Sequence, residues 1–303
     1  MALDRDAKKF LEMMKGMPSF DPNMPAEKAR KMQLSQMENI PLEQVEAVTD
    51  HKIPNSKIWV REYVPYKSAF GGALLYIHGG GYVFGSVATY DPFVRHLCNL
   101  SGMRIFSLEY RLAPENKFPA AHDDSFRAYE WLVNNASELK IDHRKITVMG
   151  DSAGGSLAAY VTHHSVASKG VAPSSQILLY PYLGDSASTP SFRENRSGYL
   201  LTEEIMTWFG EQYRSHGIST QERLKYQVKP EGDPEDFPLT VVVTAEYDPL
   251  RDGGEQYADM MMEFGAKVLS LRANGMIHGF MTNYLMIPQA EEYLRAVSAM
   301  IPR

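Results

Sequence analysis

The sequence predicts an α/β fold in which a mostly parallel sheet carries helices on both faces. Two observations lead to this prediction. From about residue 45 onward, short apolar segments of strand length alternate with longer segments of helical periodicity, which is typical of parallel sheets with helical crossovers. The chain has 303 residues, 44% of them hydrophobic and 22% charged. A chain of that size buries about three quarters of its unfolded surface, which is enough for a substantial core.

Seven segments are predicted to be strands and four to be helices. Residues 57–64 alternate between polar and apolar side chains like a half-buried strand, whereas the later strands are short apolar runs. In chain order these runs are residues 73–77, 104–108, 145–149, 176–180, 239–244 and 267–271. The predicted helices are residues 122–134, 153–168, 251–264 and 288–300.

Two further segments lie outside this alternation. Residues 1–45 contain two helical stretches separated by a segment rich in proline, and residues 183–229 are apolar and helical where another strand would be due. We expect residues 1–45 and 183–229 to form a helical cap over the sheet. The α/β domain would then consist of residues 46–182 and 230–303. An extra packing layer without a gating role is the alternative interpretation.

Composition excludes several classes of function. The net charge of −6 and the lack of a basic stretch argue against a nucleic-acid partner. No apolar run reaches the ~18 residues of a membrane-spanning helix, and the first 20 residues are too charged for a signal peptide. Cys98 is the only cysteine, so a disulfide within the chain is impossible and a cytoplasmic location is expected.

The pentapeptide Gly150-Asp151-Ser152-Ala153-Gly154 fits the pattern G-x-S-x-G. It follows a predicted strand and opens a predicted helix, which is the context that this motif of serine nucleophiles requires. The serine of such a sharp strand-to-helix turn has a strained backbone, and side chains at the two glycine positions would collide with neighbouring elements. We therefore expect Ser152 to be a catalytic nucleophile, activated by a nearby base.

The tetrapeptide His78-Gly79-Gly80-Gly81 follows the predicted strand at residues 73–77. Three consecutive glycines are unfavourable unless the backbone must approach another group closely. We expect the N–H groups of Gly80, Gly81 and Ala153 to bind the oxyanion of a tetrahedral intermediate, and Gly79 is a weaker candidate. His78 is expected to orient this loop rather than to act as the base. The alternative, a phosphate-binding loop, lacks the lysine and serine or threonine that normally end it.

The order serine, acid, histidine along the chain selects the other two catalytic candidates. His278 lies in a predicted loop after the late strand at residues 267–271, whereas His216 lies in the predicted cap, so His278 is the expected base. Asp248 comes immediately after the strand at residues 239–244 and is the expected acid. Glu246 competes with it, while Asp252 is explained by favourable charge in the first turn of a helix.

Together these motifs resemble the hormone-sensitive-lipase family of α/β-hydrolases, in its bacterial and archaeal esterase branch. The resemblance covers about residues 74–280. Besides the two glycine motifs, it rests on four further sequences: Tyr110-Arg111-Leu112-Ala113-Pro114-Glu115, Phe118-Pro119-Ala120-Ala121, Glu246-Tyr247-Asp248-Pro249-Leu250-Arg251-Asp252 and His278-Gly279-Phe280. It maps the nucleophile, acid and base of the family onto Ser152, Asp248 and His278. Tyr82 departs from the family, which usually has Phe or Trp after the triple glycine.

The resemblance implies an α/β-hydrolase fold with an eight-stranded sheet, a helical cap and frequent homodimers. It further implies a serine carboxylesterase acting on small short- to medium-chain acyl esters, without metal or organic cofactor. An amidase or deacetylase with the same triad, and a ligand-binding receptor of the same fold, are the alternatives. The expected substrate pocket consists of Tyr82, Leu201, Ile205, Met206, Phe209 and Met276. Ordinary core packing is the alternative for Leu201, Ile205, Met206, Phe209 and Met276.

Overall fold

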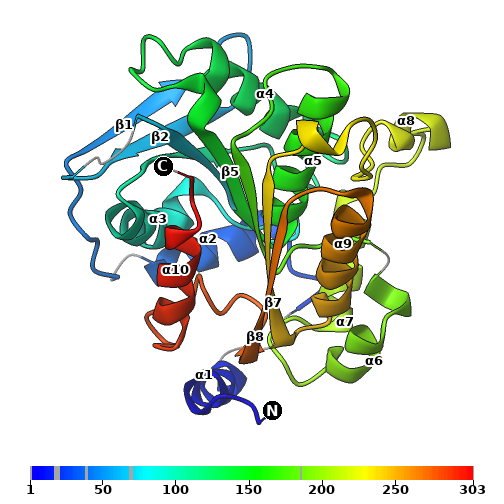
Figure 1. The fold of residues 1–303 in the computed structure, drawn as a ribbon. Helices are drawn as coiled ribbons and strands as arrows, with labels where there is room; N and C mark the ends of the chain where they lie inside the picture. Colours follow the sequence, from blue (N-terminus) through cyan, green and yellow to red (C-terminus); the bar gives the residue numbers. More distant parts are fainter. Residues whose placement is uncertain (1, 17–20, 38–39, 68–70, 185, 303) are drawn as a thin grey trace.

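The computed structural model describes residues 2–16, 21–37, 40–67, 71–184 and 186–302. Its centre is an eight-stranded sheet in the order β1-β2-β4-β3-β5-β6-β7-β8 (Figure 1). The pairs β1–β2 and β2–β4 are antiparallel and the remaining pairs are parallel, which confirms the predicted fold class. The strands are β1 (Ala47–Lys52), β2 (Trp59–Val64), β3 (Ala73–Ile77), β4 (Arg104–Glu109), β5 (Ile146–Asp151), β6 (Ser175–Leu179), β7 (Leu239–Tyr247) and β8 (Val268–Ile277).

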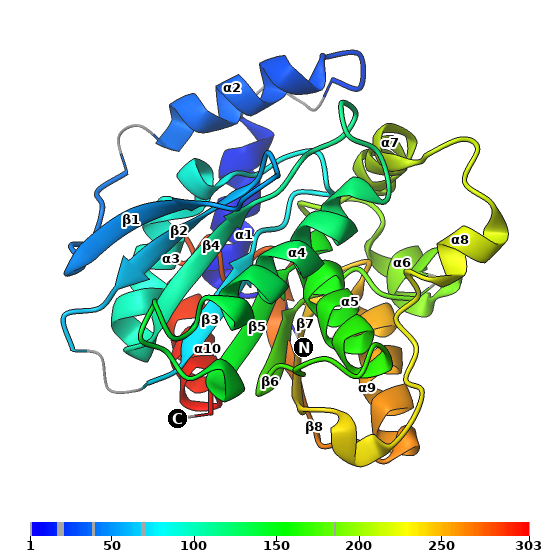
Figure 2. The same cartoon turned by 90° about the horizontal axis from the view of Figure 1, so that it is seen from above.

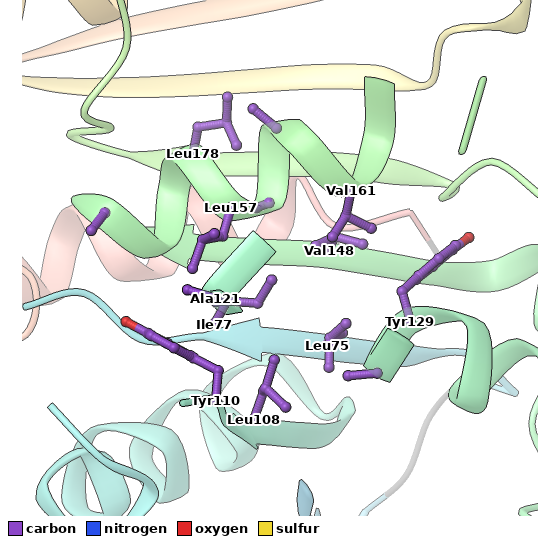
Figure 3. Packing of buried hydrophobic residues seen from close by; sticks show 14 of the residues in the cluster. Leu75, Ile77, Leu108, Tyr110, Ala121, Tyr129, Val148, Leu157, Val161 and Leu178 are labelled. Atoms are coloured by element: carbon purple, nitrogen blue, oxygen red, sulfur yellow. The ribbon is translucent and has the colours of Figure 1, made fainter. Parts of the chain in front are cut away.

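Helices cover both faces of the sheet, and each face has its own apolar core. Alternate residues of β3 show this, since Leu75 and Ile77 pack with α4 and α5 (Figure 3) while Leu74 and Tyr76 pack with α3 and α10 on the other face. The helices are α1 (Arg5–Lys15), α2 (Ala26–Met37), α3 (Val87–Ser101), α4 (Ala120–Asn134), α5 (Ala153–Ala167), α6 (Pro190–Asn195), α7 (Glu203–Tyr213), α8 (Thr220–Leu224), α9 (Arg251–Phe264) and α10 (Ala290–Ala299). No helix within the described ranges is long and apolar enough to cross a bilayer.

Two strands differ from the sequence prediction. Strand β1 was not predicted, because its residues are mostly exposed and its sequence shows no apolar alternation. Strand β8 continues to Ile277, through residues expected to form a loop. A bulge between Ala245 and Tyr247 of β7 accommodates this continuation, and Gly275 takes the positive φ of 76°.

The segments predicted as a cap contact one another and the edge of the site. Figure 2 shows α2 and α7 outside the sheet. The Trp208 indole of α7 donates a hydrogen bond of 3.0 Å to the carbonyl of Pro22, just before α2. Arg30 of α2 donates to the carbonyls of Val83 and Ala113, which lie in loops after β3 and β4. Helix α1 instead lies beside β8, where Asp4 N–H donates to the carbonyl of Gly275.

Candidate active site

Ser152 occupies the turn between β5 and α5, with φ 54° and ψ −121°. This is a strained conformation for a residue with a side chain, as the sequence predicts for this motif. A Cβ atom on Gly150 would lie 2.2 Å from the carbonyl oxygen of Gly154, and one on Gly154 would lie 2.0 Å from that of Ile77. Both glycines are therefore required for the close approach of β5, α5 and β3.

Ser152, His278 and Asp248 lie in one row at the ends of three strands. The Nε2 atom of His278 is 3.0 Å from Ser152 Oγ, and its Nδ1 atom is 2.7 Å from Asp248 Oδ2. Asp248 is fully buried, and its other oxygen accepts a hydrogen bond of 2.8 Å from Leu250 N–H. The acid is thus fixed by the turn after β7, and the histidine by the end of β8.

The other candidate acids and bases have different partners. Glu246 accepts a hydrogen bond of 2.7 Å from Gly275 N–H and so supports the bulge beside β8. Asp252 accepts one of 2.7 Å from Ser191 N–H and pairs with Arg251. His216 is exposed in the segment after α7. None of these side chains belongs to the hydrogen-bonded row that reaches Ser152.

The glycine loop after β3 presents backbone N–H groups next to Ser152. Gly80 and Gly81 have positive φ values of 102° and 61°, and Gly81 and Ala153 line the same cavity as Ser152. Among the described residues, no acceptor pairs with the N–H groups of Gly80, Gly81 or Ala153. The N–H of Gly79 differs, since it donates to Asp151 Oδ1 at 2.9 Å and is not available to a substrate.

His78 is buried beneath this loop rather than directed at Ser152. Its ring stacks on that of Tyr110 with centroids 4.3 Å apart, and its Nδ1 atom lies 2.8 Å from the carbonyl oxygen of Gly79. Burial lowers the pKa of His78 to about 4. A neutral, packed histidine supports the loop, which agrees with the orienting role expected from the sequence.

A cavity of about 280 Å³ opens over Ser152. Its walls come from the glycine loop after β3, the segment before α4, α7 and the turn after β7. The lining residues are Gly81, Tyr82, Phe118, Ser152, Ala153, Tyr182, Leu201, Met206, Phe209, Gly210, Tyr213, Arg214, Arg223 and Leu250. In the described ranges, no three His, Cys, Asp or Glu side chains are grouped as metal ligands would be.

Four of the six expected pocket residues line this cavity, namely Tyr82, Leu201, Met206 and Phe209. Met276 does not, because β8 continues through it and its side chain lies in the core between the sheet, α3 and α10, with 1% exposed. Ile205 does not line the cavity either, because it precedes Met206 on α7, where neighbouring residues point in different directions.

Tyr213 and Phe118 line the cavity although neither was among the expected pocket residues. Tyr213 stacks on Tyr82 with ring centroids 4.1 Å apart. Phe118 belongs to one of the motifs on which the resemblance rests, and this was the available signal. Tyr213 ends α7, and its distance from Tyr82 along the chain left no signal for the contact.

The site has the parts of a serine hydrolase of the α/β-hydrolase fold. These parts are a serine in a strand-to-helix turn, a histidine and an aspartate hydrogen-bonded to it in sequence, and a glycine loop at the end of a neighbouring strand. A family model described as alpha/beta hydrolase fold matches residues 74–282, and the chain belongs to this family. Within it, the chain belongs to the hormone-sensitive-lipase family, as the sequence motifs predicted.

Relatives and solved structures agree with this assignment. The chain is 36% identical over 235 residues to an ethyl acetate hydrolase of Pseudomonas putida, covering 74% of this chain and 70% of the relative. It is 36% identical over 230 residues to an arylesterase of Saccharolobus solfataricus, covering 76% and 75%. The structure of a hyperthermophilic esterase from the archaeon Pyrobaculum calidifontis superposes with a TM-score of 0.87, at 36% identity and 99% and 98% coverage.

Proposed function

We propose that this carboxylesterase hydrolyses short- to medium-chain acyl esters with Ser152 as nucleophile, His278 as base and Asp248 as acid. Carboxylesterase activity follows from the family and from the esterases among its relatives. The assignment of residues rests on one observation, the continuous row from Asp248 through His278 to Ser152 at 2.7 and 3.0 Å.

In the first step, His278 Nε2 removes the proton of Ser152 Oγ as this oxygen attacks the ester carbonyl carbon. Asp248 accepts the hydrogen bond from Nδ1–H, which holds the ring in the required tautomer and stabilises the imidazolium. The carbonyl oxygen becomes an oxyanion and accepts hydrogen bonds from the N–H groups of Gly80, Gly81 and Ala153.

Collapse of the tetrahedral intermediate breaks the bond to the alcohol oxygen. His278 gives its proton to the departing alcohol, and the acyl group remains on Ser152 as an ester. A water molecule then loses a proton to His278 and attacks the acyl carbon, through a second oxyanion in the same loop. Collapse of this second intermediate breaks the bond between the acyl carbon and Ser152 Oγ, and His278 returns its proton to Oγ as the carboxylic acid leaves.

The proposed preference for modest acyl chains is supported by the size and walls of the cavity. Its 280 Å³ lies near the lower end of the roughly 300–1,000 Å³ usual for small-molecule sites. Leu201, Met206 and Phe209 supply apolar walls from the segment 183–229. We further propose that this segment and residues 1–45 form a cap, since the hydrogen bond from Trp208 to Pro22 joins them.

Hydrolysis of p-nitrophenyl esters tests the assignment directly. The purified protein should release nitrophenol from acetyl to octanoyl esters, and Ser152→Ala should lower kcat by about 10⁴-fold or more. A Ser152→Ala variant that keeps its turnover contradicts the nucleophile assignment. A chain-length optimum at C14 or longer contradicts the proposed substrate class while leaving the nucleophile intact.

We also propose a cytoplasmic homodimer. The lone cysteine, Cys98, is buried, and burial raises the pKa of its thiol to about 12, so it takes no part in disulfides between copies. The dimer is proposed from the family resemblance. Light scattering coupled to gel filtration should give twice the chain mass of 34.2 kDa, and a monomer mass contradicts the proposal.

A further inference from the structure

The carboxylate of Asp151 lies between the nucleophile and the oxyanion loop, and the proposed chemistry does not use it. The residue directly precedes Ser152 and is only 3% exposed. Its Oδ1 atom accepts hydrogen bonds of 2.9 Å from Gly79 N–H and 2.7 Å from Tyr76 OH. Its Oδ2 atom accepts one of 3.0 Å from Tyr90 OH. Three donors therefore converge on one buried side chain.

These donors favour the ionised form of Asp151. Burial raises the pKa of this carboxyl group, and the hydrogen bonds from Tyr76, Tyr90 and Gly79 oppose that effect. A carboxylate offers acceptors only, which matches three donors and explains why a buried charge is tolerated here.

The contact with Asp151 also explains the first glycine of the loop. Gly80 and Gly81 have positive φ values, but Gly79 is not among the residues with positive φ. A Cβ atom at position 79 would lie 2.5 Å from Asp151 Oδ2 and 2.8 Å from the Asp151 carbonyl oxygen. Glycine is therefore required at position 79 by the approach of Asp151, not by backbone conformation.

Other contacts hold the loop on either side of this point. Tyr110 OH donates to the His78 carbonyl at 3.0 Å, and Val83 N–H donates to the Gly80 carbonyl at 3.0 Å. Neither contact joins the loop to the turn that carries Ser152. The hydrogen bond from Gly79 to Asp151 does so through the residue next to the nucleophile.

We propose that Asp151 is a positioning residue that fixes the oxyanion loop relative to Ser152. By accepting the Gly79 N–H, it sets where the next two N–H groups, those of Gly80 and Gly81, lie with respect to the attacked carbonyl. Glycine has more backbone freedom than any other residue. Without the contact to Asp151, the N–H groups of Gly80 and Gly81 would therefore occupy many positions. This inference rests on the proposed function, because it assumes that the loop binds an oxyanion.

The central test compares Asp151→Ala with Asp151→Asn. Alanine removes the acceptor for Gly79, so kcat should fall by about 10- to 100-fold, less than or similar to the loss of one oxyanion donor. Because the substrate is bound mainly by the cavity walls, KM should change by less than about threefold. Asparagine keeps an amide oxygen for Gly79 and offers N–H to Tyr90, so it should restore kcat to within about fivefold of wild type.

Asp91→Ala is the matched control for simple loss of a buried carboxylate. Asp91 lies in α3, is 7% exposed, and accepts a hydrogen bond of 2.6 Å from Tyr63 OH, so its loss also leaves a tyrosine unpaired. It should lower the melting temperature while kcat stays within about twofold of wild type. Should Asp151→Ala fail to fold, Asp151→Ser replaces it, since a serine hydroxyl is too short to reach Gly79.

A trifluoromethyl ketone gives a readout of the oxyanion loop that needs no turnover. Ser152 Oγ adds reversibly to the ketone carbon while His278 takes the proton, which leaves an oxyanion like that of the intermediate. The affinity for this inhibitor should fall in Asp151→Ala by the same factor as kcat/KM. In Asp91→Ala it should not change.

The outcomes separate this proposal from the proposed function. Three kinetic results would overturn the positioning role. They are a wild-type kcat in Asp151→Ala, a loss of kcat/KM in that variant that comes from a raised KM, and an Asp151→Asn variant as impaired as Asp151→Ala. Unchanged inhibitor affinity in Asp151→Ala would do the same. If wild type lacks esterase activity, or Ser152→Ala retains it, the proposed function itself fails.

Discussion

At the scale of single residues, the proposed catalytic acid is distinguished by which hydrogen bonds it makes. Asp248 and Asp252 lie four positions apart, and both carboxylates are largely buried and hydrogen-bonded. Asp248 faces the imidazole of His278, whereas Asp252 faces Ser191 N–H at the start of α6 and the guanidinium of Arg251. Substitution of each carboxylate by its isosteric amide therefore separates a catalytic from a structural role.

Asp248→Asn should lower kcat by about 10³- to 10⁴-fold with little change in KM, because the amide favours the wrong tautomer of His278. Asp252→Asn keeps an oxygen for Ser191 and should stay within about threefold of wild type. Steady-state kinetics on p-nitrophenyl butyrate measures both. Equal losses in the two variants would remove the reason for assigning the acid to Asp248.

The order of residues along the sequence was enough to select Ser152, Asp248 and His278, which lie in one hydrogen-bonded row. It was not enough to explain why the neighbouring positions are glycines. From the sequence, the run of three glycines is explained by the approach of a substrate, with Gly80 and Gly81 as the main candidates and Gly79 as a weaker one. In the fold, Gly79 approaches Asp151, and a Cβ on Gly81 would lie 2.3 Å from the ring of Phe209. These partners are 72 and 128 positions away along the chain, and a local motif carries no information about such contacts.

At the scale of elements, one arginine joins α2 to the loops beside the site. Arg30 Nε donates to the Val83 carbonyl at 2.7 Å, and Nη2 donates to the Ala113 carbonyl at 2.5 Å and to Glu115 Oε2 at 2.8 Å. Few apolar contacts hold this helix, since Ala26 is its only residue classed as buried among those described. The position of α2 therefore depends strongly on this side chain.

Arg30→Ala should lower the free energy of unfolding by about 1–3 kcal/mol, because two partly buried carbonyl groups lose a charged donor. Arg30→Lys should recover less than half of the loss, since one ammonium group cannot reproduce the fork of the guanidinium. Lys31→Ala is the control: its side chain is 74% exposed and pairs across the helix surface with Glu27. Urea unfolding measures all three, and an Arg30→Ala variant as stable as Lys31→Ala contradicts the expectation.

The elements that sequence periodicity predicted best are the buried ones. Strand β3 begins and ends where predicted, and all five of its residues are buried. The edge strand β1 was not predicted because an exposed strand needs no apolar pattern. Its backbone pairing with β2, which the sequence does not reveal, holds it in the sheet. The extension of β8 escaped because Asn274 and Gly275 have the composition of a turn, whereas a bulge places them in a strand.

At the scale of the whole molecule, three buried histidines link stability to pH. Burial lowers the pKa of His78 to about 4, of His122 to about 3 and of His163 to about 4, against 6.5 for an exposed ring. His78 lies under the glycine loop after β3, His122 in α4 and His163 in α5, so the effect belongs to no single element. Between pH 6.5 and about 4, the unfolded chain binds protons that the folded chain does not.

Stability should therefore be highest well above pH 6.5 and decrease as the pH falls, with a slope that approaches about 1.4 kcal/mol per pH unit for each of the three histidines once the pH is well below 6.5. Between pH 6.5 and 5 this amounts to about 4–5 kcal/mol, and the loss slows below the folded-state pKa values. Asp151 opposes this loss of stability at low pH. Because its pKa is raised, the folded state binds a proton at this carboxylate at a higher pH than the unfolded chain does.

Urea unfolding at half-unit steps from pH 7 to pH 5 measures this slope. His163→Gln removes one of the three groups from α5, outside the row that reaches Ser152, and its side chain can still bond to Tyr257 OH. The variant should lose about a third of the pH dependence, whatever its stability at pH 7. If wild type keeps a constant free energy of unfolding over this range, the three histidines bind protons as readily in the folded protein as in the unfolded chain. A wild-type slope in His163→Gln gives the same conclusion for His163. The burial of these histidines would then be relieved by water or by local opening, which hydrogen exchange at α4 and α5 would reveal.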